Sequence, residues 1–309
     1  MTLSGAFLGL FYLVVFPGFA FTAVVGLFSS WVERKLSARL QWRVGPPWYQ
    51  PFADFLKLLG KENVVPQGAS RIGFFGAPVV GLAGVTLAST VLWMANISPG
   101  STFVGDLIAV IYLLILPSLG IIIGGSFSRN PFGATGASRE VKLMLAYEMP
   151  FLIALMTPVV KSGGLISIGA LLDFQQGQGW MLGNASCALA FTAALFSSQA
   201  KLGLAPFDIS EAETELIAGP LVEYSGSALA LFKLTKAMLL AVLPILLITI
   251  FLGGAWSPWT PLAYVLILGF FILLKNTNPR VRIDQAMRFF WIPLLALATL
   301  GIVLAAVGV

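Results

Sequence analysis

Histidine is absent from this 309-residue sequence, and cysteine occurs once, as Cys187 within an apolar stretch. A disulfide within the chain is therefore impossible, and thiolate iron–sulfur, zinc and haem sites are excluded. A nucleophile activated by histidine is excluded as well. We therefore expect no cofactor in this chain, and any redox centre with which it works must lie on another polypeptide.

Charged residues are also scarce. They make up 10% of the chain and apolar residues 58%, whereas a soluble domain has roughly 25% charged residues. No basic region precedes the first apolar stretch and no small-residue cleavage site stands out, so we expect a membrane span there and not a removed signal peptide. The basic residues are not interleaved with aromatic platforms, which disfavours nucleic-acid binding.

Long apolar runs show how the chain is organised. A helix that crosses a bilayer needs about 20 apolar residues. Such runs fall at about 4–30, 72–95, 105–127, 139–160, 181–200, 227–252, 259–275 and 288–308. The seventh run is the weakest, because Pro258 and Pro261 blur its start. The sequence predicts an all-α integral membrane protein of about eight transmembrane helices, in a single domain over residues 1–309, with short amphipathic helices in the connecting loops.

The basic residues indicate the orientation of these spans. Every lysine and arginine except Lys161 falls in the first, third, fifth or seventh connection or in the flanks of that connection. Positive residues concentrate in cytoplasmic loops. We therefore expect the odd-numbered connections to be cytoplasmic and both termini to lie outside, in the cell membrane.

The first connection, residues 31–71, has a helical pattern. Its basic residues Lys35, Arg39 and Arg43 recur every four residues, on one face of a helix that continues the first span until the Gly45-Pro46-Pro47 sequence ends it. Pro51 then opens a short amphipathic helix. Its apolar face carries Phe52, Phe55, Leu56 and Leu59, and its charged face carries Asp54, Lys57 and Lys61. This connection is either a docking surface for a cytoplasmic subunit, which the ordered pattern favours, or a loop that binds anionic lipid headgroups.

The connection at 201–226 is acidic, unlike the other odd-numbered connections. One lysine stands beside five acids, Asp208, Glu211, Glu213, Glu215 and Glu223. Ser210 and Glu213 have the spacing of a helix capping box, and Asp208, Glu211 and Glu215 would share one side of that helix. Carboxylates so close together repel each other, so some should hold protons near neutral pH.

Three interpretations of the acidic connection remain open: a solvated turn whose glutamates cap a helix, a surface that contacts a basic partner, or a proton-holding antechamber at the membrane surface. Gly219, Pro220 and Gly226 bracket Glu223 and Tyr224, which places this pair on a tight loop.

Acidic residues also occur inside the apolar runs. Glu148 lies nine residues past Arg139, hence about 13–14 Å into the fourth span. An ionisable group at that depth marks an ion path by default, the alternative being a protonated packing residue. Glu140 lies on nearly the same helical face, and Asp106 begins the third span near the outer side. Because no span carries a lysine or histidine at mid-depth, we expect this chain to couple to an ion path rather than contain a whole pump.

Three segments together resemble a known family. They are ERKLSARLQWRVGPPWYQPFADFLKLLGKE (33–62), PFDISEAETEL (206–216) and GPLVEYSG (219–226). They resemble the eight-span membrane subunit shared by respiratory complex I and the energy-converting membrane-bound [NiFe] hydrogenases. The short path from Gly45-Pro46-Pro47 to Gln50-Pro51, and Pro220 after Gly219, are more similar to the hydrogenase branch.

This resemblance implies a membrane-anchoring and ion-coupling subunit without a catalytic centre of its own. The expected partners are hydrogenase-like large and small subunits, which carry the NiFe centre and iron–sulfur clusters, and antiporter-like membrane subunits. The coupling positions implied are Glu148, Glu211, Glu213, Glu215 and Glu223, with Glu140, Asp208 and Asp106 as further candidates. The candidate docking residues are Lys35, Arg39, Arg43, Asp54, Lys57, Lys61 and Tyr224. The alternatives are a quinone-chamber subunit of complex I and a free-standing secondary transporter, for which the expected inverted repeats are not evident.

Overall fold

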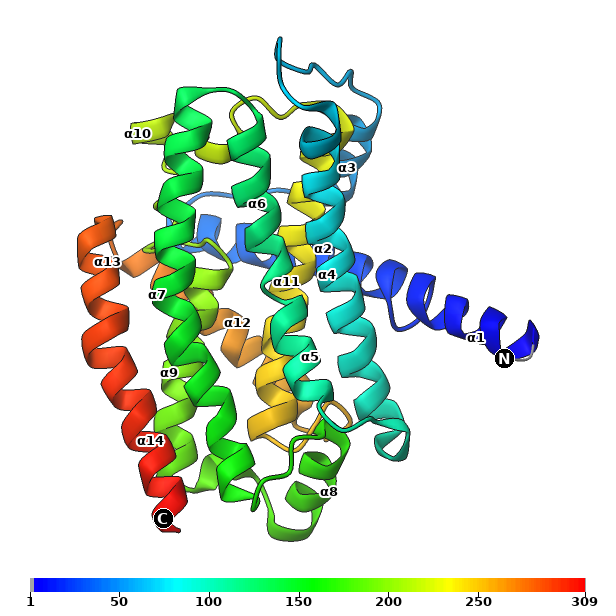
Figure 1. Ribbon diagram of the computed structural model, residues 1–309, viewed down its shortest axis with the longest axis vertical. Helices are drawn as coiled ribbons and strands as arrows, with labels where there is room; N and C mark the ends of the chain where they lie inside the picture. The colour runs from blue at the N-terminus through cyan, green and yellow to red at the C-terminus, as the bar shows by residue number, and fades with distance from the viewer. Residues whose placement is uncertain (1–2, 309) are drawn as a thin grey trace.

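The computed structural model describes residues 3–308 and contains only helices and loops within that range (Figure 1). The first half of the chain forms α1 (Leu3–Val14), α2 (Phe19–Leu40), α3 (Gln50–Leu59), α4 (Arg71–Ile97), α5 (Asp106–Leu113), α6 (Leu116–Phe127) and α7 (Pro131–Lys161). The second half forms α8 (Ile168–Gln178), α9 (Ala185–Lys201), α10 (Glu213–Leu216), α11 (Gly226–Phe251), α12 (Thr260–Thr277), α13 (Ile283–Phe289) and α14 (Leu295–Val307).

The membrane architecture agrees with the prediction. Seven helical segments of the described chain are long and apolar enough to cross a membrane. α9 is 17 residues long, one residue fewer than the shortest of these seven segments. The described chain is thus an all-α integral membrane protein with close to eight spans, and the predicted fold class is confirmed.

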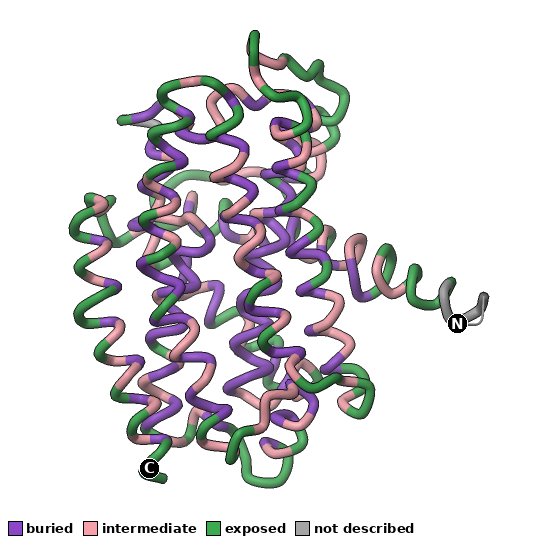
Figure 2. The backbone as a smooth tube through the Cα atoms, viewed as in Figure 1, coloured by how far each residue is buried: buried purple, intermediate pink, exposed green. Residues whose placement is uncertain are grey.

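Helix α11 forms the centre of the bundle. Beyond Lys233 and Lys236, which lie in its first half, it is apolar on every side, and its second half is buried. A helix with this pattern is stable only when other helices surround it. α11 packs against α2, α4 and α9, and Figure 2 shows the buried residues concentrated along the interior of the bundle.

Small residues allow the helices of the bundle to approach closely. A Cβ atom added to Gly120 of α6 would lie 2.7 Å from the carbonyl oxygen of Ala77 in α4. One turn further on, a Cβ atom on Gly124 would lie 2.7 Å from the Tyr224 hydroxyl. Glycines at a four-residue spacing serve this purpose between membrane helices, so α6 and α4 can pack with their backbones in contact.

The two ends of the bundle carry different elements. Helices α3 and α10 lie at one end, which we call the motif end, while α8 and the C-terminal end of α14 lie at the other (Figure 1). α1 projects from the side of the bundle. Which end faces the cytoplasm stays a prediction from the distribution of basic residues.

The first connection differs from the prediction in one respect. α2 ends at Leu40, and Trp42 has a positive φ of 59°. Arg43 therefore lies in the loop at 41–49 and not on the helical face of Lys35 and Arg39; its amide bonds the Ala38 carbonyl at 2.7 Å. The helix predicted after Pro51 is present as α3, with Phe52 and Phe55 packed against the main core.

Candidate functional site

A buried ion pair joins α7 to the end of α9. Lys201 Nζ lies 2.8 Å from Oε2 and 3.2 Å from Oε1 of Glu148. The lysine side chain is 1% exposed and the glutamate side chain 11% exposed. Removing one partner of a buried pair typically costs roughly 3–5 kcal/mol, because the other charge is left uncompensated. Glu148 is therefore held in the protein interior by a specific partner.

The position of Lys201 corrects one expectation. Its place in the fifth connection suggested a residue of the membrane surface, and no mid-depth lysine was expected. The 17 residues of α9 rise only about 25 Å, which is less than the roughly 30 Å of a bilayer core. The helix ends inside the bundle, where the Lys201 ammonium lies 5.0 Å from the centroid of the Phe151 ring.

Glu140 lies nearer the motif end on the same face of α7. It is 7% exposed, and Ser210 and Ser118 lie close to its carboxylate. Ser118 Oγ lies 2.9 Å from the Tyr147 hydroxyl. Lys201 interacts electrostatically with Glu148 and, more weakly, with Glu140. The lysine is thus placed between two buried carboxylates of one helix.

A small cavity connects these groups to the next ion pair. It measures about 20 Å³, which is enough for one water molecule. Its polar lining comes from Ser118, Glu140, Lys201, Ser210, Glu211, Thr235 and Lys236. Glu211 forms an ion pair with Lys236 of α11, and the two side chains are 24% and 28% exposed.

Five charged residues therefore follow one another from the interior toward the motif end. We call Glu148, Lys201, Glu140, Glu211 and Lys236 the interior charge row. Their signs alternate except between Glu140 and Glu211, and all of them except Glu148 line the same water-sized cavity. Such an arrangement can pass a proton in short steps without placing an unpaired charge in the apolar interior.

The remaining acids of the 201–226 connection do not share one helical face, which corrects the prediction. Asp208 pairs with Arg280 at 2.7 Å, and Glu215 pairs with Arg139 of α7 at 2.5 Å. Each of these carboxylates has a cation of its own, supplied from a distant part of the chain. The mutual repulsion on which the prediction depended is therefore not present.

The predicted capping box is also wrong. α10 begins at Glu213 with Ala212 as its N-cap, and no side chain caps it. Ser210 is instead buried and lines the same small cavity as Glu140. The side chain of Glu213 lies outside the described residues. Glu223 accepts a hydrogen bond from the Asn130 side-chain amide, next to the start of α7.

Asp106 is distant from the interior charge row and has a visible structural role. Its Oδ1 accepts hydrogen bonds from the backbone amides of Leu107 and Ile168, both at 2.7 Å. These bonds fix the first residue of α8 to the start of α5. Oδ2 is buried and has no hydrogen-bond partner within residues 3–308. A coupling role for Asp106 stays a prediction.

The predicted docking residues on and next to α2 and α3 lie at the surface. Arg39, Arg43, Lys57 and Lys61 are exposed, and Lys35 is partly exposed. Asp54 accepts hydrogen bonds from Arg34 at 3.0 Å and Gln50 at 2.8 Å. Burial raises the pKa of Asp54, but these bonds and the charges of Arg34 and Lys57 outweigh it, so its pKa lies below the usual range. α2 and α3 are thereby tied into one surface.

Tyr224 cannot present a docking surface, which corrects its assignment. The residue is 4% exposed, its ring stacks on Phe74 with centroids 4.1 Å apart, and its hydroxyl donates to the Phe74 carbonyl at 3.0 Å. Burial raises the pKa of Tyr224, so the phenol stays protonated and donates.

We predict a purely structural effect for Tyr224→Phe. The variant loses one buried hydrogen bond, worth about 1 kcal/mol, and should lower the melting temperature of the purified complex slightly. The amount of partner protein that co-purifies should stay unchanged. Loss of partners at unchanged thermal stability would contradict this assignment.

One ion pair with a buried carboxylate was not anticipated from the sequence. Glu33 of α2 is 7% exposed and lies 2.5 Å from the Lys275 ammonium of α12. Glu33 begins the first of the three family-like segments, but nothing local indicates its partner 242 residues away. The pair connects the first span to the seventh.

Comparison with known proteins shows to which family the chain belongs. A sequence model of NADH dehydrogenase matches residues 12–306. The chain belongs to this family. It is 36% identical to a subunit of the NADH-quinone oxidoreductase of Thermomicrobium roseum, over 89% of each chain. It is 35% identical to the corresponding subunit in Syntrophotalea carbinolica, over 98% of each chain.

A solved structure also resembles this member of the NADH dehydrogenase family. A chain of the membrane-bound sulfane sulfur reductase, an archaeal respiratory membrane complex, superimposes with a TM-score of 0.83. It shares 30% identity and covers 93% of this chain and 96% of its own length. The protein is therefore a multi-pass membrane subunit of a complex I-like respiratory assembly.

Proposed function

We propose that this chain is the membrane-anchoring and ion-coupling subunit of a membrane-bound hydrogenase-type complex. In this proposal it links electron transfer in a peripheral module to the translocation of protons or sodium ions in antiporter-like membrane subunits. The NiFe centre and the iron–sulfur clusters belong to the peripheral module. The single observation that carries the proposal is the interior charge row, whose deepest member is the buried Glu148 carboxylate.

The geometry supports a simple coupling step. Lys201 has a flexible stem and lies within the field of both Glu148 and Glu140. When its ammonium moves toward Glu140, Glu148 loses its counter-charge in an apolar environment, and a neutral, protonated carboxyl becomes the favoured form. When the ammonium returns, the proton is released. A change of charge near Glu211 and Lys236 at the motif end can drive this exchange across the water-sized cavity.

The same geometry favours protons over sodium ions as the species that would move within this chain. A carboxylate that binds Na⁺ needs several free oxygen ligands, whereas both oxygens of Glu148 lie within 3.2 Å of Lys201 Nζ. An ammonium at that position repels a second cation. Where sodium is pumped, the sodium site therefore belongs to another polypeptide of the complex.

The hydrogenase assignment is supported by the first connection. Only residues 41–49 separate α2 from α3, in agreement with the short path that resembles the hydrogenase branch. The likeness to the sulfane sulfur reductase chain is compatible with a related complex that uses another terminal acceptor. The second candidate, a quinone-chamber subunit of complex I, is favoured by the names of the relatives.

Purification through a tag on this chain separates the two candidates. The hydrogenase proposal predicts nickel and iron in the complex, hydrogen formation from a reduced low-potential donor such as ferredoxin, and no binding of quinone-site inhibitors. A complex without nickel that reduces quinone would contradict the proposal and support the second candidate. Unaided transport by the isolated chain in liposomes would contradict both.

The exposed basic surface of α2 and α3 yields a further prediction. Reversing two of its charges in the Arg39→Glu/Lys57→Glu variant should lower retention of the peripheral module about tenfold, since each exposed charge contributes up to about 1 kcal/mol. Lys161→Glu is the matched control, because Lys161 lies at the opposite end, where it bonds the Gly308 carbonyl. Full retention of the module together with weaker binding of anionic vesicles would instead assign this surface to lipid headgroups.

A further inference from the structure

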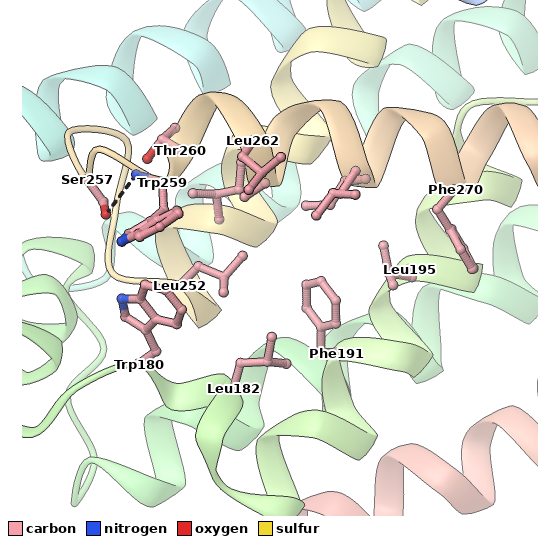
Figure 3. A pocket seen from close by; sticks show the side chains of 14 residues that line it. Trp180, Leu182, Phe191, Leu195, Leu252, Ser257, Trp259, Thr260, Leu262 and Phe270 are labelled. Carbon is pink, nitrogen blue, oxygen red and sulfur yellow. Dashed lines mark hydrogen bonds between the residues drawn. The ribbon is translucent and has the colours of Figure 1, made fainter. Parts of the chain in front are cut away.

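An apolar groove separates α12 from α9 on the outside of the bundle. Its volume is about 390 Å³. Figure 3 shows Leu262 and Phe270 of α12 on one side and Phe191 and Leu195 of α9 on the other. Among its lining side chains only Ser257, Thr260 and two tryptophans carry polar atoms. The groove is independent of the interior charge row.

The groove exists because α12 uses a different face for protein contacts. Leu268, Phe271 and Ile272 of α12 are buried, and the helix packs against α11 and α2. Leu262 and Leu266 point away from that contact and remain 53% and 63% exposed. Large apolar side chains so exposed in a membrane protein are covered by hydrocarbon or by another protein.

The polar atoms of the groove gather at one end. Trp180 and Trp259 lie there with their indole nitrogens close to Ser257 (Figure 3), and the two residues are 48% and 58% exposed. Tryptophan is enriched where the hydrocarbon core meets the headgroups. No charged residue lines the groove within the described chain. The groove thus has an uncharged, interfacial mouth and a hydrocarbon-like interior.

The dimensions fit one leaflet of a bilayer. From Trp259 to Phe270 the chain advances 11 residues, or about 16 Å along a helix, and half of a bilayer core is about 15 Å. A hydrocarbon chain of that length, about 4–5 Å wide from carbon contact distances, fills roughly 200–300 Å³. The groove of 390 Å³ is therefore large enough for one such chain and too small for two side by side.

We infer that this groove is a binding site for one hydrocarbon chain of a bilayer lipid. The lipid carries an uncharged or zwitterionic headgroup, whose ester or ether oxygens accept hydrogen bonds from the indole groups of Trp180 and Trp259. The bound chain fills the space between α9 and α12. These helices also meet through a bond from the Gln199 amide to the Phe271 carbonyl, at 3.3 Å, and through an edge contact between the Phe196 and Phe270 rings. The lipid adds to these contacts and so braces the helix that ends in Lys201.

The test compares lipid retention in two variants of the intact complex. Leu266→Trp fills the groove, whereas Leu300→Trp adds the same bulk at an exposed position of α14, where Leu300 is 53% exposed. Native mass spectrometry after detergent exchange should show one lipid fewer per copy in Leu266→Trp, and wild-type retention in Leu300→Trp. Equal retention in all three proteins, or the same loss in both variants, would overturn the inference.

A second measurement identifies the occupant without a bulky substitution. A photoreactive amino acid at position 266 should, on illumination of the complex in membranes, yield an adduct with the mass of a bilayer lipid. An adduct with a polypeptide would show that a partner helix covers the groove, and an adduct with the mass of a quinone would assign it to an electron carrier. Either adduct would overturn the lipid assignment while leaving the ion-coupling proposal untouched.

Discussion

The variant Glu148→Gln is expected to abolish ion pumping by the assembled complex, while the peripheral module keeps its hydrogen turnover with a soluble dye. Glutamine has nearly the same volume as glutamate and can hydrogen-bond to Lys201, so the packing around position 148 is retained. It cannot take up and release a proton. The interior charge row is then interrupted at its deepest group, 53 residues in sequence from the lysine that it meets in space.

The measurement reconstitutes the purified complex in vesicles and records ion uptake and dye-linked turnover in the same preparation. Glu62→Gln is a suitable control, because Glu62 is an exposed glutamate at the motif end and is not part of the row. It should pump at the wild-type rate. Normal pumping by Glu148→Gln would remove Glu148 from the mechanism, and loss of dye-linked turnover would indicate a damaged complex instead.

The glutamates of the interior charge row could be predicted from the sequence, whereas its two lysines could not. A glutamate within an apolar run must be buried if the run is a span, and the spacing of Glu140 and Glu148 places both on one face of α7. Lys201, by contrast, lies at the end of a run, where sequence alone cannot tell a surface residue from a buried one. The burial of Lys201 depends on where α9 ends relative to the rest of the bundle, and only the structure shows this.

Pairing between distant segments explains the other differences. Helical spacing in the sequence predicts only which residues are neighbours within one helix. It therefore predicted that Asp208, Glu211 and Glu215 share one helical face. Their actual partners lie 25 to 76 residues away in sequence. Tyr224 was misassigned for the same reason, since its stacking partner Phe74 lies 150 residues earlier. Tertiary contacts override local pattern where loops fold back into a bundle.

The variant Lys201→Met tests the buried pair itself. Methionine keeps the length of the lysine stem but leaves the Glu148 carboxylate without a cation in the bundle interior. We expect a loss of roughly 3–5 kcal/mol in stability, seen as a large fall in the melting temperature of the purified complex, together with loss of pumping. The double variant Glu148→Gln/Lys201→Met removes both charges at once. It should recover most of the lost stability, because replacing a buried pair by uncharged groups is close to neutral.

Recovery of stability without recovery of pumping separates the two roles of the pair. A contact that only holds α7 against α9 would be replaced by the uncharged pair in both respects, and the double variant would then pump. A contact that stores and releases a proton cannot be replaced by uncharged groups, however well they pack. A double variant that is stable and inactive in ion uptake therefore requires the charges themselves, whereas one that pumps would limit Glu148 and Lys201 to a structural role.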